Sequence, residues 1–148
     1  MLKELELAAH ALGVQVQYLD VRAPKDIESA FRTAAKARAD AVILSQNPVF
    51  TFDRKQVVTL AGKNRIPAAY HSVEFVEDGG LMTYSVSVTD LFRRAATYVD
   101  RILKGAKPAD LPIEQPKKFE FIVNLKAAKQ IGLAIPPNVL ARADRVIR

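Results

Sequence analysis

The alternation of short apolar segments with amphipathic helices constrains the fold of this chain more than any other feature. Residues 14–21 and 67–71 have the pattern of strands, and the run at 39–45 is apolar enough for a strand buried on both faces. Helical patterns at about 25–38 and 53–64 separate these segments, with short connections. A strand–helix–strand–helix–strand series of this kind predicts a parallel sheet covered by helices.

We therefore expect an α/β fold with a doubly wound parallel sheet. Because a central parallel strand is covered on both faces, Val42, Ile43 and Leu44 should be among the most buried residues. A further helix is expected before Gly13, since glycine accepts the left-handed conformation found just past many helix ends.

Composition excludes several classes of protein. The chain has 148 residues, of which 49% are hydrophobic and 26% charged, as in a folded domain of common size. It contains no cysteine, which excludes disulfides, thiolate metal sites and cysteine nucleophiles. The sequence has no glycine-rich phosphate loop, zinc-protease motif or serine-hydrolase motif. We therefore expect no catalysis, no cofactor and no metal ion.

The net charge of +6 is moderate, and the lysines and arginines are spread along the chain. This distribution is typical of solvated helix faces and argues against a nucleic-acid groove, where basic residues gather with aromatic ones. No apolar run approaches the roughly 18 residues that span a bilayer. The first residues carry two acids and no apolar core, unlike a secretory signal, so the chain as given is expected to stay in the cytoplasm.

The second half carries the most specific sequence. The pair Gly79–Gly80 opens a predicted strand at 81–87, and a long amphipathic helix, a proline-rich connector at 105–116 and a strand at 119–124 follow. The stretch LFRRAATYVDRILKGAKPADLPIEQPKKFEFIVNLKAAKQIGL closely resembles the C-terminal part of ABC-transporter substrate-binding proteins. These are two-lobed periplasmic receptors of the type I fold, and only the C-terminal portion of such a receptor is represented.

The resemblance implies a division of the chain. Residues 1–104 correspond to a Rossmann-like ligand-binding lobe, similar to the second lobe of a type I receptor, with its first strand missing. That strand is expected to be central in the sheet. Residues 105–116 correspond to a crossover linker, and residues 117–148 to the C-terminal strand and helices that belong to the first lobe in full receptors.

The resemblance also implies a function. The chain is expected to be the solute-binding component, or a truncated form of it, of an ABC-type importer for a small organic ligand, with an amino acid as the leading class. The lobes would close around the ligand, and an ABC permease would recognise the closed state. The location implied by the resemblance is the periplasm, in conflict with the cytoplasmic location expected from the lack of a signal sequence.

Ligands of open α/β sheets bind beyond the carboxyl ends of the strands, which selects three candidate segments. The predicted ligand-binding residues are Gln46, Asn47, Phe50, Thr51, His71, Glu74, Tyr84 and Ser85. The first segment also fits a turn at Asn47–Pro48, a helix cap and a core phenylalanine. Glu74 also suits a capping or hinge role. Related receptors more often have Tyr-Gly at the third segment, so Ser85 departs from the family pattern.

Two other functions stay open. The chain also suits a cytoplasmic ligand-sensing regulatory module, or a truncated assembly module that holds no ligand. The apolar strand at 119–124 would be exposed without its usual lobe, so we expect a homodimer in which the C-terminal strand and helix are exchanged or packed across a two-fold axis. In the competing arrangement this strand folds back into the chain's own sheet.

Overall fold

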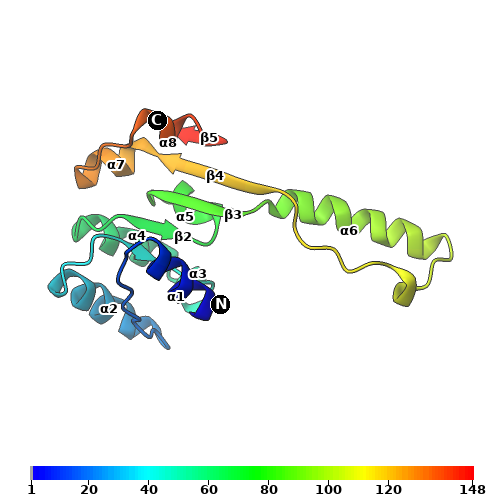
Figure 1. Cartoon of the computed structure of the whole chain (residues 1–148), viewed down its shortest axis with the longest axis horizontal. Helices are drawn as coiled ribbons and strands as arrows, with labels where there is room; N and C mark the ends of the chain where they lie inside the picture. The colour runs from blue at the N-terminus through cyan, green and yellow to red at the C-terminus, as the bar shows by residue number, and fades with distance from the viewer. Residues whose placement is uncertain (1) are drawn as a thin grey trace.

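A five-stranded sheet organises the chain in the computed structural model, which describes residues 2–148 (Figure 1). Its strands are β1 (Val42–Ile43), β2 (Ala68–Tyr70), β3 (Met82–Val86), β4 (Phe119–Asn124) and β5 (Arg145–Ile147), and they lie side by side in this order. β1, β2 and β3 are parallel, β4 is antiparallel to β3, and β5 is parallel to β4. The predicted α/β class is therefore confirmed, with a sheet that is mostly parallel.

Helices precede the first strand and occupy each later connection. They are α1 (Leu2–Ala11), α2 (Pro24–Lys36), α3 (Pro48–Phe52), α4 (Arg54–Lys63), α5 (Val73–Glu77), α6 (Val88–Leu103), α7 (Leu125–Ile131) and α8 (Pro137–Leu140), with a 3-10 turn at Pro108–Asp110. The helices predicted at 25–38 and 53–64 are confirmed as α2 and α4. No helix within residues 2–148 is both long and apolar enough to cross a bilayer.

Local signals explain why α2 begins where it does. Pro24 occupies the first turn, where its missing N–H is not needed, and the Asp26 carboxylate accepts hydrogen bonds from the backbone N–H groups of Arg22 (3.1 Å) and Ala23 (2.9 Å). Ile27 and Phe31, four residues apart on one side of the helix, are buried. They enter the main core together with side chains from β2, α4 and α5.

The segment at 14–21 does not form the predicted strand. Its backbone joins no ladder of the sheet, and Val14, Val16 and Tyr18 are exposed. β1 is the edge of the sheet, and nothing within residues 2–148 pairs with its outer side. A strand is stabilised only when a neighbouring strand pairs with its backbone N–H and C=O groups. The alternating pattern of residues 14–21 was therefore insufficient to predict a strand. The sheet therefore ends at β1, and residues 14–21 are not part of it.

The edge position of β1 also corrects the predicted burial. Leu44 is 7% exposed, as expected, whereas Val42 is only partly buried and Ile43 is 74% exposed. Side chains alternate between the two faces of a strand, and here only the face that carries Leu44 meets the core formed with α2 and α4. The apolar run therefore marks a strand covered on one face.

β4 is part of the chain's own sheet. It pairs with β3 over a register that runs from Met82 opposite Val123 to Val86 opposite Phe119. The strand at 119–124 thus takes the competing arrangement, and a homodimer stays a prediction. The element that stands apart is α6 with its following connector, which project away from the sheet (Figure 1). Whether residues 117–148 belong to the first lobe in full receptors stays a prediction.

Gly80 lies where the backbone before β3 passes closest to the core. A Cβ at this position would lie 2.5 Å from Cε2 of Tyr70 and 2.7 Å from the carbonyl oxygen of Phe75. Because a backbone oxygen cannot move aside easily, Gly80→Ala should reduce the free energy of unfolding by about 1–3 kcal/mol. Urea unfolding followed by circular dichroism measures this directly.

Gly62→Ala is the matched control. Gly62 lies inside α4, and a Cβ there would lie 3.4 Å from the flexible amide end of Gln130. Since alanine is favoured over glycine within helices, this variant should be unchanged or more stable by about 0.5–1 kcal/mol. Equal destabilisation by both variants would contradict the close packing at Gly80.

Candidate functional site

The predicted site residues lie along one edge of the sheet. β1, β2 and β3 are parallel neighbours, so their carboxyl ends meet at the same edge. Gln46 and Asn47 follow β1, and His71 follows β2. Tyr84 is the middle residue of β3, one position beyond Thr83, which lies opposite Tyr70. The topology therefore brings the three predicted segments to one edge, while their role in ligand binding stays a prediction.

In the segment after β1, most of the predicted side chains take part in the fold. Oδ1 of Asn47 accepts from the N–H of Val49 (2.9 Å) at the start of α3, and Nδ2 donates to the carbonyl of Val21 (3.0 Å). Phe50 packs against the main core, and the Thr51 hydroxyl donates to the carbonyl of Asn47 (3.3 Å). A cap and a core phenylalanine are thus present, but the capping side chain is Asn47, directly before Pro48 in α3, and no separate turn forms there. Gln46 and Thr51 are exposed.

His71 carries an unsatisfied polar atom. Its Nδ1 is buried and has no hydrogen-bond partner within residues 2–148, and its ring meets that of Phe75 edge-on at 5.0 Å. Burial lowers the pKa of His71, and the opposing effect of Glu74 is smaller. The imidazole is therefore held toward its neutral form, in which one ring nitrogen donates and the other accepts. The ring as a whole is partly exposed, whereas Nδ1 is enclosed by the protein.

Glu74 supplies negative charge close to His71. A hydrogen bond from the Ser72 side chain is the main cause that lowers the pKa of Glu74, with further contributions from Arg54 and His71. Ser72 lies immediately before α5, so this contact also suits a capping role for Glu74. Arg54, from α4, is held by an ion pair between its Nε and Oδ2 of Asp78 (2.6 Å). The carboxylate of Glu74 is exposed and ionised, and both its binding and its capping roles are open.

Tyr84 and Ser85 lie on opposite faces of β3, because successive strand residues alternate. Tyr84 is 66% exposed, stacks on Phe119 with ring centres 5.6 Å apart, and meets Phe121 edge-on at 6.4 Å. Tyr84, Phe119 and Phe121 form an exposed aromatic cluster across β3 and β4. A single ligand on one face of the sheet cannot contact the side chains of both Tyr84 and Ser85.

Sequence reasoning missed Phe119 and Phe121 as neighbours of the candidate site. Both belong to β4, more than thirty positions along the chain from Tyr84, and only the antiparallel register places Phe121 opposite Tyr84. No local pattern announces which strands will pair. The sequence showed that the strand at 119–124 is apolar, but not that Phe119 and Phe121 would lie on the same face of the sheet as Tyr84.

Two hollows of the molecule lie away from this edge. A groove of about 380 Å³ separates α6 from the connector, and a smaller one of about 130 Å³ lies between α4, α7 and the turn before β3. Neither groove is lined by a predicted ligand-binding residue. Within residues 2–148, no three His, Asp or Glu side chains lie close enough together to hold a metal ion. The candidate site is therefore an open sheet edge, in keeping with one wall of a cleft.

Polar loops at the carboxyl ends of parallel strands mark the edge at which open α/β sheets bind their ligands. The family described as ABC transporter substrate binding protein matches residues 1–147. The chain belongs to this family. Among curated proteins no match was found.

Solved structures agree with this assignment. A conserved domain protein from Vibrio cholerae is 24% identical with a TM-score of 0.86, covering 98% of this chain and 49% of that one. The ABC domain in complex with L-Trp from Streptococcus pneumoniae is 27% identical with a TM-score of 0.84, covering 98% and 50%. The ligand-free, open form of CD0873, an adhesive substrate-binding protein from Clostridium difficile, is 18% identical with a TM-score of 0.73, covering 99% and 48%. The chain thus spans about half the length of the proteins it resembles.

Proposed function

We propose that this chain is a solute-binding component of an ABC-type importer and that it binds an amino acid at the carboxyl edge of its sheet. Family membership over residues 1–147 is the observation that carries the proposal. The similar domain from Streptococcus pneumoniae is described in complex with L-Trp, which supports amino acids as the ligand class. An ABC permease is the implied partner, and the periplasm the implied location.

The predicted residues offer complementary chemistry for an amino acid. The ionised carboxylate of Glu74 would accept hydrogen bonds from the ligand ammonium group. The exposed amide of Gln46 and the partly exposed imidazole of His71 would meet the ligand's polar atoms. Tyr84 and its aromatic neighbours would supply an apolar wall for the ligand side chain.

In this proposal the described residues form one wall of a cleft, which the rest of a full receptor completes. Closure of the two walls would bury the ligand and create the state that a permease recognises. The pairing of β4 with β3 favours placing residues 119–147 in the same lobe as β1–β3. The crossing between lobes would then involve α6 and the connector. A homodimer is a further part of the proposal.

Binding to a single wall should be weak. We expect L-Trp to bind the isolated chain with a Kd on the order of 1 mM, measured by chemical-shift changes in an NMR titration. Glu74→Gln should weaken binding about tenfold, because a charged hydrogen-bond acceptor is lost. The shifts should concentrate at residues 45–47, 71–74 and 84.

Glu77→Gln is the matched control. Glu77 lies at the other end of α5, and its Oε1 accepts from Arg145 (2.9 Å) at an exposed site. This variant should leave the Kd unchanged within about twofold. Micromolar binding by the monomeric chain would show that one wall suffices. No shifts with any amino acid at about 20 mM would contradict the proposed function.

A further inference from the structure

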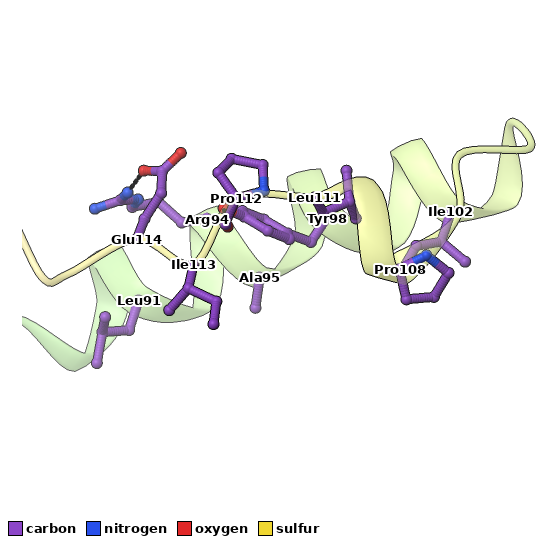
Figure 2. A pocket seen from close by; sticks show the side chains of 10 residues that line it. All are labelled: Leu91, Arg94, Ala95, Tyr98, Ile102, Pro108, Leu111, Pro112, Ile113 and Glu114. Atoms are coloured by element: carbon purple, nitrogen blue, oxygen red, sulfur yellow. Dashed lines mark hydrogen bonds and ion pairs between the residues drawn. The ribbon is translucent and has the colours of Figure 1, made fainter.

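The two grooves described above differ in how their polar side chains are paired. In the groove between α6 and the connector, the Tyr98 hydroxyl donates to the carbonyl of Pro112 (2.6 Å), and Arg94 forms an ion pair with Glu114 (Figure 2). The smaller hollow, of about 130 Å³, contains a polar side chain without such a partner. That side chain is Tyr70, and we call the smaller hollow the Tyr70 pocket.

Tyr70 is buried, but its hydroxyl is unpaired. The side chain is 4% exposed, its ring stacks on Phe75, and its Cε2 edge lies against Gly80, which has no side chain to cover it. Within residues 2–148 the hydroxyl makes no hydrogen bond, and burial alone raises the pKa of Tyr70. Buried hydroxyls are normally paired because an unpaired one costs free energy. Tyr70 therefore keeps a protonated donor that the fold does not use.

The hydroxyl of Tyr70 borders open space. Among the side chains of residues 2–148, the buried atom that is both fully enclosed and unpaired is Nδ1 of His71. The Tyr70 hydroxyl is unpaired too, so it is not fully enclosed by protein. Since Tyr70 lines the pocket of about 130 Å³, this is the space that its hydroxyl meets. The donor is therefore free for a molecule that enters the pocket.

The walls of the Tyr70 pocket all come from this chain and are largely apolar. They are formed by α4, by the segment that contains β2, by the turn before β3 and by α7. Apolar surface is supplied by Val58, Ala61, Ile66, Leu81 and Ile131. Such walls offer water no hydrogen bonds, so water in the pocket has few partners and is readily displaced by an apolar group.

Charge and size narrow the class of ligand. Asp78 lines the pocket, but its Oδ2 is held by Nε of Arg54 (2.6 Å), so its charge is balanced within the fold and a neutral ligand is favoured. The exposed amide of Gln130, also in the lining, can both donate and accept. A cavity of about 150 Å³ holds one benzene-sized molecule. The pocket, of similar volume, therefore suits a single ring.

We propose that the Tyr70 pocket binds a small neutral ring compound that carries a hydroxyl, with the Tyr70 hydroxyl donating a hydrogen bond to the ligand oxygen. Phenols are the simplest members of this class. The ring would contact the apolar walls, and the amide oxygen of Gln130 would accept the proton of the ligand hydroxyl. The site is separate from the amino-acid site proposed at the carboxyl edge, because none of its lining residues is a predicted ligand-binding residue.

NMR titration of the whole chain with phenol and with benzene tests the site. Phenol at up to about 10 mM should shift the backbone N–H signals of Gly79 and Gly80 and the side-chain amide of Gln130, with a Kd on the order of 1 mM. Benzene has the same ring but cannot accept from the Tyr70 hydroxyl. It should therefore bind at the same residues about fivefold more weakly.

Tyr70→Phe removes the hydroxyl and keeps the ring. This variant should bind phenol and benzene equally, and its urea midpoint should not fall, because the hydroxyl has no partner in the fold to lose. Tyr18→Phe is the matched control. Tyr18 is 47% exposed, its hydroxyl donates to Glu6 (3.3 Å), and it does not line the pocket. The control should prefer phenol as the unmodified chain does.

Each contrary result identifies what is wrong. No shifts at the lining residues with about 10 mM phenol would overturn the proposal and leave the pocket to water alone. Equal binding of phenol and benzene by the unmodified chain, or a preference for phenol that survives Tyr70→Phe, would overturn the role of the hydroxyl. A lower urea midpoint for Tyr70→Phe would show that the hydroxyl is paired within the fold. Amino-acid binding is measured separately, by the L-Trp titration at the carboxyl edge.

Discussion

Phe75→Ala is expected to reduce the free energy of unfolding by about 3–5 kcal/mol. Phe75 is fully buried, stacks on Tyr70 with ring centres 4.9 Å apart, and meets the ring of His71 edge-on at 5.0 Å. Truncation removes the apolar contacts of a whole ring and leaves a cavity between β2 and α5. The chain has no tryptophan, so urea unfolding followed by circular dichroism is the suitable measurement.

The same variant should change the candidate site. Burial lowers the pKa of His71, and the Phe75 ring is part of what buries it. Removing the ring admits water, so the pKa of His71 should rise toward its ordinary value, as followed by NMR titration of the imidazole. Phe52→Ala is the control, because Phe52 is 87% exposed, and it should change stability by less than about 0.5 kcal/mol. Similar losses for both phenylalanines would contradict the described core.

Leu44→Ala should reduce the free energy of unfolding by about 2–5 kcal/mol, whereas Ile43→Ala should cost less than about 0.5 kcal/mol. These neighbours are both large and aliphatic, but Leu44 faces the core and Ile43 faces outward. The pair therefore isolates the effect of burial from that of residue type. A large loss for Ile43→Ala would show that the outer face of β1 is covered in solution.

Measuring the cost of Ile43→Ala at several protein concentrations tests whether another chain covers the outer face of β1. If a partner protects the outer face of β1, the cost of Ile43→Ala should grow with protein concentration, because association stabilises only the folded state. The described residues 2–148 leave the Ile43 side chain 74% exposed. The cost should therefore be the same at low and high concentration.

Elements with strong local signals could be predicted from sequence. α2 has a proline in its first turn, a capping carboxylate at Asp26, and Ile27 and Phe31 on one side, all within a few residues. The strand at 119–124 was also predicted with the bounds that β4 has, because its apolar residues have high strand propensity. In such segments neighbouring side chains carry most of the information.

The candidate site could be predicted only in part. Gln46 and His71 were selected because ligands of open α/β sheets bind beyond the carboxyl ends of the strands. The parallel order of β1 to β3 places both residues at that edge. It did not reveal that Asn47 ties the segment after β1 to Val21, or that Tyr84 and Ser85 face opposite sides. Those relations depend on distant backbone atoms and on strand orientation.

The sequence by itself determined α2, α4, β4 and the family, since these depend on periodicity, capping residues and a specific local motif. The tertiary structure alone decided which segments would pair and which faces would be covered. Residues 14–21 have a strand pattern but no neighbour, and β4 finds its partner across the length of α6 and the connector. The physical reason is that a strand needs a neighbouring strand to pair with its backbone, and an amphipathic helix needs another element to cover its apolar face. The local sequence of a segment does not identify that partner.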